Sequence, residues 1–248
     1  MSRIRACLPP SLVVALLLSA PAAGRCSAPA SSSPADSTAT RVAPTPLARL
    51  QAGNRRFVAN AATPLPVSNQ RRSELAKGQA PFAIVLTCAD SRVPPELIFN
   101  AGLGDLFVVR AAGEVIDRSV LASVEYAAEH LHAPLLVVMG HEACGAVKAA
   151  MGPPAPMGPN LDYLVGAIRP AVARVSSTPE ARRLEAAIKA NVEQVIGDAI
   201  DRSDVLSHLI GSGKLKVVGA YYELASGRVV ISQAVDAAAL PHATAVGH

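Results

Sequence analysis

The sequence contains no tryptophan, and aromatic residues make up only 3% of its 248 residues. Proteins that bind single-stranded nucleic acids stack the bases on aromatic side chains, so this composition disfavours that function. The formal net charge is only +4, which is too small to indicate a nucleic acid or an anionic membrane as a partner. The apolar run LVVALLLSA near the N-terminus is too short to span a bilayer. We therefore expect no nucleic-acid partner and no transmembrane segment in the mature chain.

Residues 1–23 have the three-part pattern of a secretory signal peptide. Arg3 and Arg5 precede the apolar run, and the small residues APAA follow it. This order of basic, apolar and small residues is typical of a segment that is cleaved on export. We expect cleavage between residues 22 and 28, and a mature protein that is periplasmic or secreted.

A lipoprotein anchor at Cys26 is a competing interpretation of this N-terminal region. Arg25 disfavours it, because such an anchor site takes a small residue at that position.

Two further segments border the predicted domain. Residues 24–46 are rich in Ser, Ala and Pro, which is typical of a disordered tether. Residues 47–232 are long enough for one domain with a substantial core. The Ala-rich residues 233–248 are expected to be an irregular tail.

The sequence has only four cysteines, and two of them belong to the predicted domain. Cys7 lies in the signal peptide and Cys26 at its edge, whereas Cys88 and Cys144 lie within residues 47–232. In an oxidising compartment two cysteines commonly form a disulfide. A disulfide between Cys88 and Cys144 is therefore one interpretation, and a shared metal site is another.

Apolar segments of strand length alternate with segments of helical periodicity through the predicted domain. The segments AIVLT and LLVVMG are apolar throughout, which indicates parallel strands covered by helices on both faces. These patterns predict an α/β fold with a mainly parallel sheet flanked by helices, an antiparallel edge hairpin and an N-terminal helical arm. The expected strands are residues 83–87, 105–110, 135–140, 214–224 and 228–232, and the expected helices are 46–61, 69–77, 119–132 with Ser119 as N-cap, 142–151, and a mostly helical 159–211 that Pro170 interrupts.

Metal-binding and charged side chains follow two of the expected parallel strands. Cys88-Ala-Asp90-Ser-Arg92 follows the first strand, and His141-Glu-Ala-Cys144 follows the third. The carboxyl ends of parallel strands meet at one edge of a sheet, where α/β proteins place their chemistry. His141 and Cys144 are expected on one face of the first helical turn. Two thiolates and an imidazole are the ligand set of a catalytic zinc ion with an open fourth position.

Each of these residues also has a purely structural interpretation. Lone buried cysteines are usually inert packing residues, and an exposed pair such as Asp90 and Arg92 is usually a weak ion pair. The coincidence of three ligating side chains and a charged pair at adjacent strand ends favours a functional site.

The pattern C-x-D-S-R followed by H-x-x-C resembles the signature of the β-class carbonic anhydrases, and the resemblance extends over residues 47–232. It implies one zinc ion per chain with three ligands, Cys88, His141 and Cys144. It also implies that Asp90 orients a zinc-bound hydroxide and that Arg92 keeps Asp90 ionised. In part of the family the matching aspartate instead binds the zinc and closes the site, so Asp90 is also a candidate fourth ligand.

The resemblance further implies a pocket for CO2 and bicarbonate. Its residues are Gln79, which would hydrogen-bond bicarbonate, the aromatic walls Phe107 and Tyr126, and Gly145 with its backbone amide. Several of these reach across a dimer interface in the family, so a homodimer or a higher homo-oligomer is expected. Ala112 and Glu114 depart from the residues common in the family, and we expect them to alter substrate access. Val85 stands where members with an inhibitory bicarbonate site carry tryptophan, so no such site is expected.

The resulting prediction is a zinc-dependent enzyme that reversibly converts CO2 and water into bicarbonate and a proton. A carbon disulfide or carbonyl sulfide hydrolase on the same scaffold is the nearest alternative. A non-catalytic zinc- or bicarbonate-binding protein is the alternative from another class. Asp90, Arg92 and Gln79 argue against the latter, because a structural zinc site does not need them.

Overall fold

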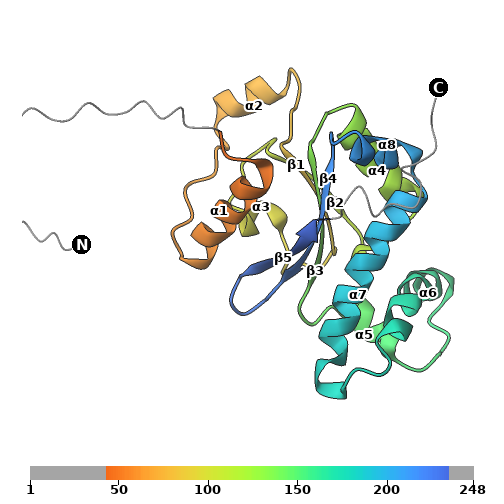
Figure 1. The fold of residues 1–248 in the computed structure, drawn as a ribbon. Helices are drawn as coiled ribbons and strands as arrows, with labels where there is room; N and C mark the ends of the chain where they lie inside the picture. Colours follow the sequence, from red (N-terminus) through yellow and green to blue (C-terminus); the bar gives the residue numbers. More distant parts are fainter. Residues whose placement is uncertain (1–42, 235–248) are drawn as a thin grey trace, which may run out of the picture. The chain divides into compact units, whose positions relative to one another are not determined.

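A five-stranded β-sheet forms the centre of the structure, which is a computed structural model that describes residues 43–234. The strand order is β2-β1-β3-β4-β5, and all neighbouring pairs are parallel except β4 and β5 (Figure 1). The predicted signal peptide, most of the tether, and the tail from residue 235 onward lie outside the described residues. The strands are β1 Ala83–Thr87, β2 Leu106–Arg110, β3 Leu135–His141, β4 Lys216–Tyr222 and β5 Val229–Ala234.

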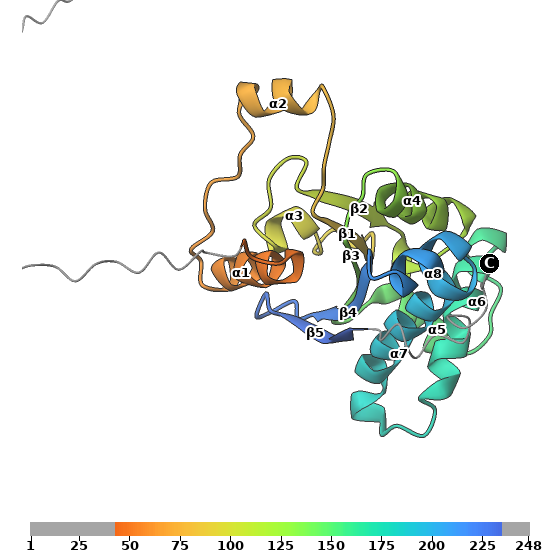
Figure 2. The ribbon, with the colours of Figure 1, turned by 45° about the horizontal axis from the view of Figure 1, so that its top comes forward.

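Helices cover both faces of this sheet. Helices α4, α7 and α8 pack on one face, and α1 and α3 pack on the other (Figure 2). Within the described residues no helix is both long enough and apolar enough to cross a membrane. The helices are α1 Pro46–Val58, α2 Asn69–Leu75, α3 Pro95–Ile98, α4 Arg118–Glu129, α5 Gly145–Met151, α6 Pro159–Arg174, α7 Glu180–Asp201 and α8 Asp204–Gly211, with a 3-10 turn, η1, at Ala112–Glu114.

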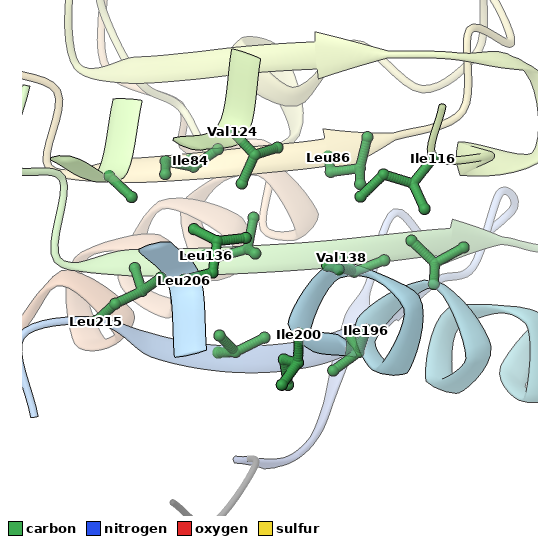
Figure 3. Close-up of a cluster of buried hydrophobic side chains, with 14 of the residues drawn as sticks. Ile84, Leu86, Ile116, Val124, Leu136, Val138, Ile196, Ile200, Leu206 and Leu215 are labelled. Atoms are coloured by element: carbon green, nitrogen blue, oxygen red, sulfur yellow. The ribbon is translucent and has the colours of Figure 1, made fainter. Parts of the chain in front are cut away.

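The core explains why the central strands are apolar along their whole length. Every residue of β1 and β3 is buried, because alternate side chains point into the cores on opposite faces. Ile84 and Leu86 of β1 lie beside Leu136 and Val138 of β3, in the core between the sheet and helices α4, α7 and α8 (Figure 3). The predicted fold class, a mainly parallel sheet with an antiparallel edge, is confirmed.

Two helices begin at residues other than those expected. Asp117, not Ser119, is the N-cap of α4, and its carboxylate accepts a hydrogen bond of 2.8 Å from the Val120 amide. Helix α5 begins only at Gly145, because Ala143 has a left-handed backbone with φ of 54°. His141 therefore ends β3 and Cys144 precedes α5, so the expected helical turn that carries both is wrong.

Three other details differ from the expectations. Pro170 lies inside α6 and does not end it. Helix α3 and the turn η1 carry no strong periodic signal and were not expected. Strand β5 continues to Ala234, two residues beyond the expected end of the domain.

Candidate metal centre

The three predicted metal ligands lie together at the carboxyl end of the sheet. Cys88 directly follows β1, His141 is the last residue of β3, and Cys144 is the N-cap of α5. Since β1 and β3 are paired neighbours, their ends bring these residues to one place. The sulfur and nitrogen ligand atoms lie within 4.8 Å of one another, and the residues are only 5%, 0% and 1% exposed.

The orientation of the His141 ring suits a metal ligand. Its Nδ1 lies 2.8 Å from the Glu142 carbonyl oxygen, which can only accept a hydrogen bond, so Nδ1 carries the proton. Its Nε2 is buried and has no hydrogen-bond partner in the described part of the chain. A free lone pair on a buried nitrogen, fixed by a hydrogen bond at the other ring nitrogen, is typical of metal-ligating histidines.

The two thiols are electrostatically coupled. The neighbouring Cys144 thiol lowers the pKa of Cys88 despite its burial, and the nearby His141 and the Gly113 amide lower it further. The same thiol pairing and burial raise the pKa of Cys144. Burial opposes a charge on His141, but the nearby Cys88 sulfur, the Glu142 carbonyl and the Asp90 carboxylate together outweigh this and raise its pKa. A negative charge shared between two buried sulfurs favours a bound cation.

Both cysteines are free, so the disulfide interpretation does not hold in this structure. Two soft thiol ligands and an unpartnered imidazole nitrogen match the ligand preferences of zinc. The residues present therefore fit the zinc ion that the sequence pattern implies.

Asp90 is held against this cluster by Arg92. The Arg92 Nε donates to Oδ1 at 2.9 Å and its Nη2 to Oδ2 at 2.7 Å, and the Arg92 backbone amide adds a third bond at 2.9 Å. These hydrogen bonds hold the pKa of Asp90 well below its usual range. Oδ2 lies 3.8 Å from the His141 Nε2. The carboxylate thus faces the ligand cluster while it is paired with Arg92.

Arg110 is a site residue that the sequence pattern did not indicate. Its Nε donates to the Cys88 carbonyl at 3.0 Å and its Nη2 to the Asp90 carbonyl at 2.6 Å. These bonds join the loop after β1 to the end of β2. Arg110 reaches this loop because it is paired with Thr87, the last residue of β1, in the sheet. Only its place at the end of the neighbouring strand could have suggested this role.

The predicted aromatic walls, Phe107 and Tyr126, do not join the cluster within one chain. Phe107 pairs with Ile84 across the sheet, which is about 13 Å along the strand from Cys88 at 3.3 Å per residue. Its ring contacts that of Tyr126, with centroids 6.3 Å apart, and Tyr126 is 48% exposed.

The two other pocket residues lie on the surface. Gln79 is exposed in the segment before β1 and lines a cavity of about 440 Å³ with α2 and the loop before β2. Gly145 begins α5 beside Cys144, and a Cβ there would meet no atom within 4 Å, so its backbone is open to a ligand.

The two departures from the family pattern lie in η1. Ala112 is half-buried, and Glu114 is completely buried with a left-handed φ of 44°. The Glu114 carboxyl accepts a hydrogen bond of 2.9 Å from the Asn191 side chain. Asn191, on α7, is another residue that the sequence pattern did not single out.

A buried Cys-His-Cys set beside a carboxylate, at adjacent strand ends of a parallel sheet, is the arrangement of a metal-dependent α/β enzyme. The carbonic anhydrase family model matches residues 83–229. A Mycobacterium tuberculosis protein named carbonic anhydrase 2 is 41% identical over 73% of this chain and 89% of its own length. A Mycolicibacterium smegmatis carbonic anhydrase is 40% identical over 73% and 88%.

Solved structures agree with these sequence relatives. A tetrameric β-carbonic anhydrase of Sordaria macrospora has a TM-score of 0.63 and 25% identity over 74% of this chain and 95% of its own. A Coccomyxa β-carbonic anhydrase in complex with acetazolamide has a TM-score of 0.63 and 25% identity, over 76% and 87%. The chain belongs to the carbonic anhydrase family, in its β class, and is a carbonate dehydratase. The family and the kind of enzyme predicted from the sequence are confirmed.

Proposed function

We propose that this chain catalyses the reversible hydration of CO2 to bicarbonate and a proton, with one zinc ion held by Cys88, His141 and Cys144. The observation that carries the proposal is the buried cluster of these three side chains, with the free Nε2 of His141 next to an Arg-held carboxylate. A structural zinc site has four protein ligands and needs no such carboxylate.

Zinc bound there would supply Lewis acidity that lowers the pKa of a coordinated water towards neutrality. Asp90 would accept a hydrogen bond from the nucleophilic oxygen and so direct its lone pair at the carbon of CO2. Arg92 supports this role in two ways: it fixes the carboxylate at two points and holds its pKa low, so that it remains an acceptor.

The substrate pocket is proposed to form between two chains. Phe107 and Tyr126 stand on the edge strand β2 and on α4, away from the cluster of their own chain. An unpaired edge strand beside exposed aromatic surface is a site that proteins usually cover. A second copy of the chain would cover this surface. The two rings would then lie at the metal centre of that second copy. Gln79 and the Gly145 amide would bind the bicarbonate oxygens.

Stopped-flow CO2 hydration, measured with zinc analysis of the same sample, tests the proposal. The expected result is about one zinc per chain and a rate that disappears with chelation and returns with zinc. Fast hydration by zinc-free protein would overturn it. Turnover of carbonyl sulfide or carbon disulfide without CO2 hydration would assign the scaffold to the alternative reaction.

Export is proposed from residues 1–23 and places this reaction outside the cytoplasm. Expression of the full chain in a bacterium, followed by fractionation and N-terminal sequencing, tests it. A processed periplasmic protein that begins between residues 23 and 29 is expected. An unprocessed cytoplasmic chain would contradict the signal peptide.

A further inference from the structure

A buried hydrogen-bond network lies behind Cys88 and connects it to helix α7. The Gly113 backbone amide donates to the Cys88 Sγ at 3.2 Å. The Asn191 side-chain amide donates to the Gly113 carbonyl at 2.8 Å and to the Glu114 Oε1 at 2.9 Å. One asparagine on α7 thus holds two residues of the turn η1, Gly113 and Glu114, and the Gly113 amide contacts the Cys88 sulfur.

The backbone of this turn needs such support. Gly113 and Glu114 both have left-handed conformations, with φ of 61° and 44°. Glycine adopts this conformation readily, but a glutamate does so only where its surroundings impose it. Glu114 is 0% exposed and Asn191 is 1% exposed, so water cannot replace either partner. The two Asn191 hydrogen bonds therefore add side-chain support to the backbone hydrogen bond of 3.0 Å from the Glu114 amide to the Ala111 carbonyl.

The Glu114 carboxyl is fully buried. It forms no ion pair within the described residues, and burial raises its pKa to about 8. Its Oε1 accepts the hydrogen bond from Asn191, whereas its Oε2 is buried without a hydrogen-bond partner in the described part of the chain. A Cβ on Gly140 would lie 3.5 Å from the Glu114 Oε1 and only 2.8 Å from Ile188. The carboxyl therefore packs beside the residue that precedes His141, and the network touches the segments that carry two of the three ligands.

We propose that Asn191 and Glu114 are positioning residues of the metal centre, which together hold the Gly113 amide on the Cys88 sulfur. The role rests on the proposed zinc site and not on the reaction at it. An amide hydrogen bond stabilises the thiolate form, which is the form that binds metal. Partners of metal ligands typically change metal affinity by about 10- to 100-fold when they are removed.

The test compares Asn191→Leu with Gln194→Leu in the purified zinc protein. Gln194 is the matched control, because it stands one turn further along α7 and also donates its side-chain amide to a backbone carbonyl, that of Ala167 in α6. The readouts are the rate of zinc loss to a chromogenic chelator and the thiolate-to-metal absorption band after cobalt substitution. Asn191→Leu is expected to lose zinc about tenfold faster or more and to shift the cobalt band, and Gln194→Leu to stay within about twofold.

A second pair of variants keeps the proposal testable if Asn191→Leu does not fold. Glu114→Gln retains the acceptor and should behave as the unaltered protein, whereas Glu114→Leu removes it and should lose zinc faster. Folded Asn191→Leu and Glu114→Leu proteins with unchanged zinc loss and cobalt bands would overturn the positioning role alone. An unaltered chain that holds no zinc would overturn the proposed function as well, so the two failures are distinguishable.

Discussion

The metal centre and the aromatic wall of the proposed pocket differ sharply in how complete they are in one chain. Cys88, His141 and Cys144 are almost wholly buried and converge from two neighbouring strands. Phe107 packs against the core of its own chain and against the ring of Tyr126, and Tyr126 is half exposed. One half of the site is thus set by the fold of a single chain, and the other half is a surface that we propose a second chain covers.

The sheet explains this difference. The central strands β1 and β3 are paired on both sides, so their carboxyl ends have fixed positions. Strand β2 is the edge, and the backbone groups on its outer side have no strand beside them in the described chain. Precise ligand geometry requires rigid support, whereas an edge allows assembly.

Loss of a metal-ligating side chain should have the largest effect, because it removes the metal centre, the half of the site that a single chain completes. His141→Gln is expected to abolish zinc binding and to lower CO2 hydration by about 10³-fold or more. Zinc analysis and stopped-flow assays check this, and circular dichroism verifies the fold. His208→Gln, at an exposed histidine of α8, is the control and should retain both properties. Stoichiometric zinc in His141→Gln would remove His141 from the ligand set.

Asp90→Asn should have the next largest effect and should separate metal binding from turnover. The amide keeps the size of the side chain but loses an acceptor, so zinc should remain while kcat falls by about 100-fold. Glu223→Gln is the matched control, since Glu223 forms a similar two-point pair with Arg228 on the surface. A rate near that of the unaltered enzyme would exclude Asp90 from the mechanism.

The metal centre, which a single chain completes, is also the half of the site that could be predicted from the sequence. Cys88 follows one apolar strand and His141 ends another, and a parallel sheet brings the carboxyl ends of such strands to one edge. Asn191 lies far along the chain on an ordinary amphipathic helix, and no local pattern marks it. Burial of Glu114 could not be predicted either, because carboxylates are rarely buried. The start of α5 depends on the left-handed Ala143, which propensities do not indicate.

Mixing two inactive variants tests directly whether a second chain completes the wall. A chain with Asp90→Asn lacks the acceptor, and a chain with Tyr126→Ala lacks part of the wall. If Tyr126 serves the partner's metal centre, each mixed dimer contains one intact site, and random exchange should restore about a quarter of the sites. The mixture is assayed after refolding together, with each variant refolded alone as the control. No recovery despite confirmed mixed dimers would place Tyr126 in the site of its own chain or outside any site.

Arg92→Gln should have the smallest effect and should act through pH. Because the hydrogen bonds from Arg92 hold the pKa of Asp90 below its usual range, their removal should raise that pKa, and the carboxyl should take up its proton at higher pH. Since the ionised carboxylate is the stronger acceptor, the acid limb of kcat should move to higher pH. A severalfold loss at neutral pH is expected because the carboxylate loses its two-point support from Arg92. Arg92 is 53% exposed, so the melting temperature should hardly change, as is usual for exposed ion pairs. Arg228→Gln is the control for loss of a surface arginine. An unchanged acid limb of kcat, measured in zinc-loaded Arg92→Gln, would show that the arginine does not control the protonation of Asp90.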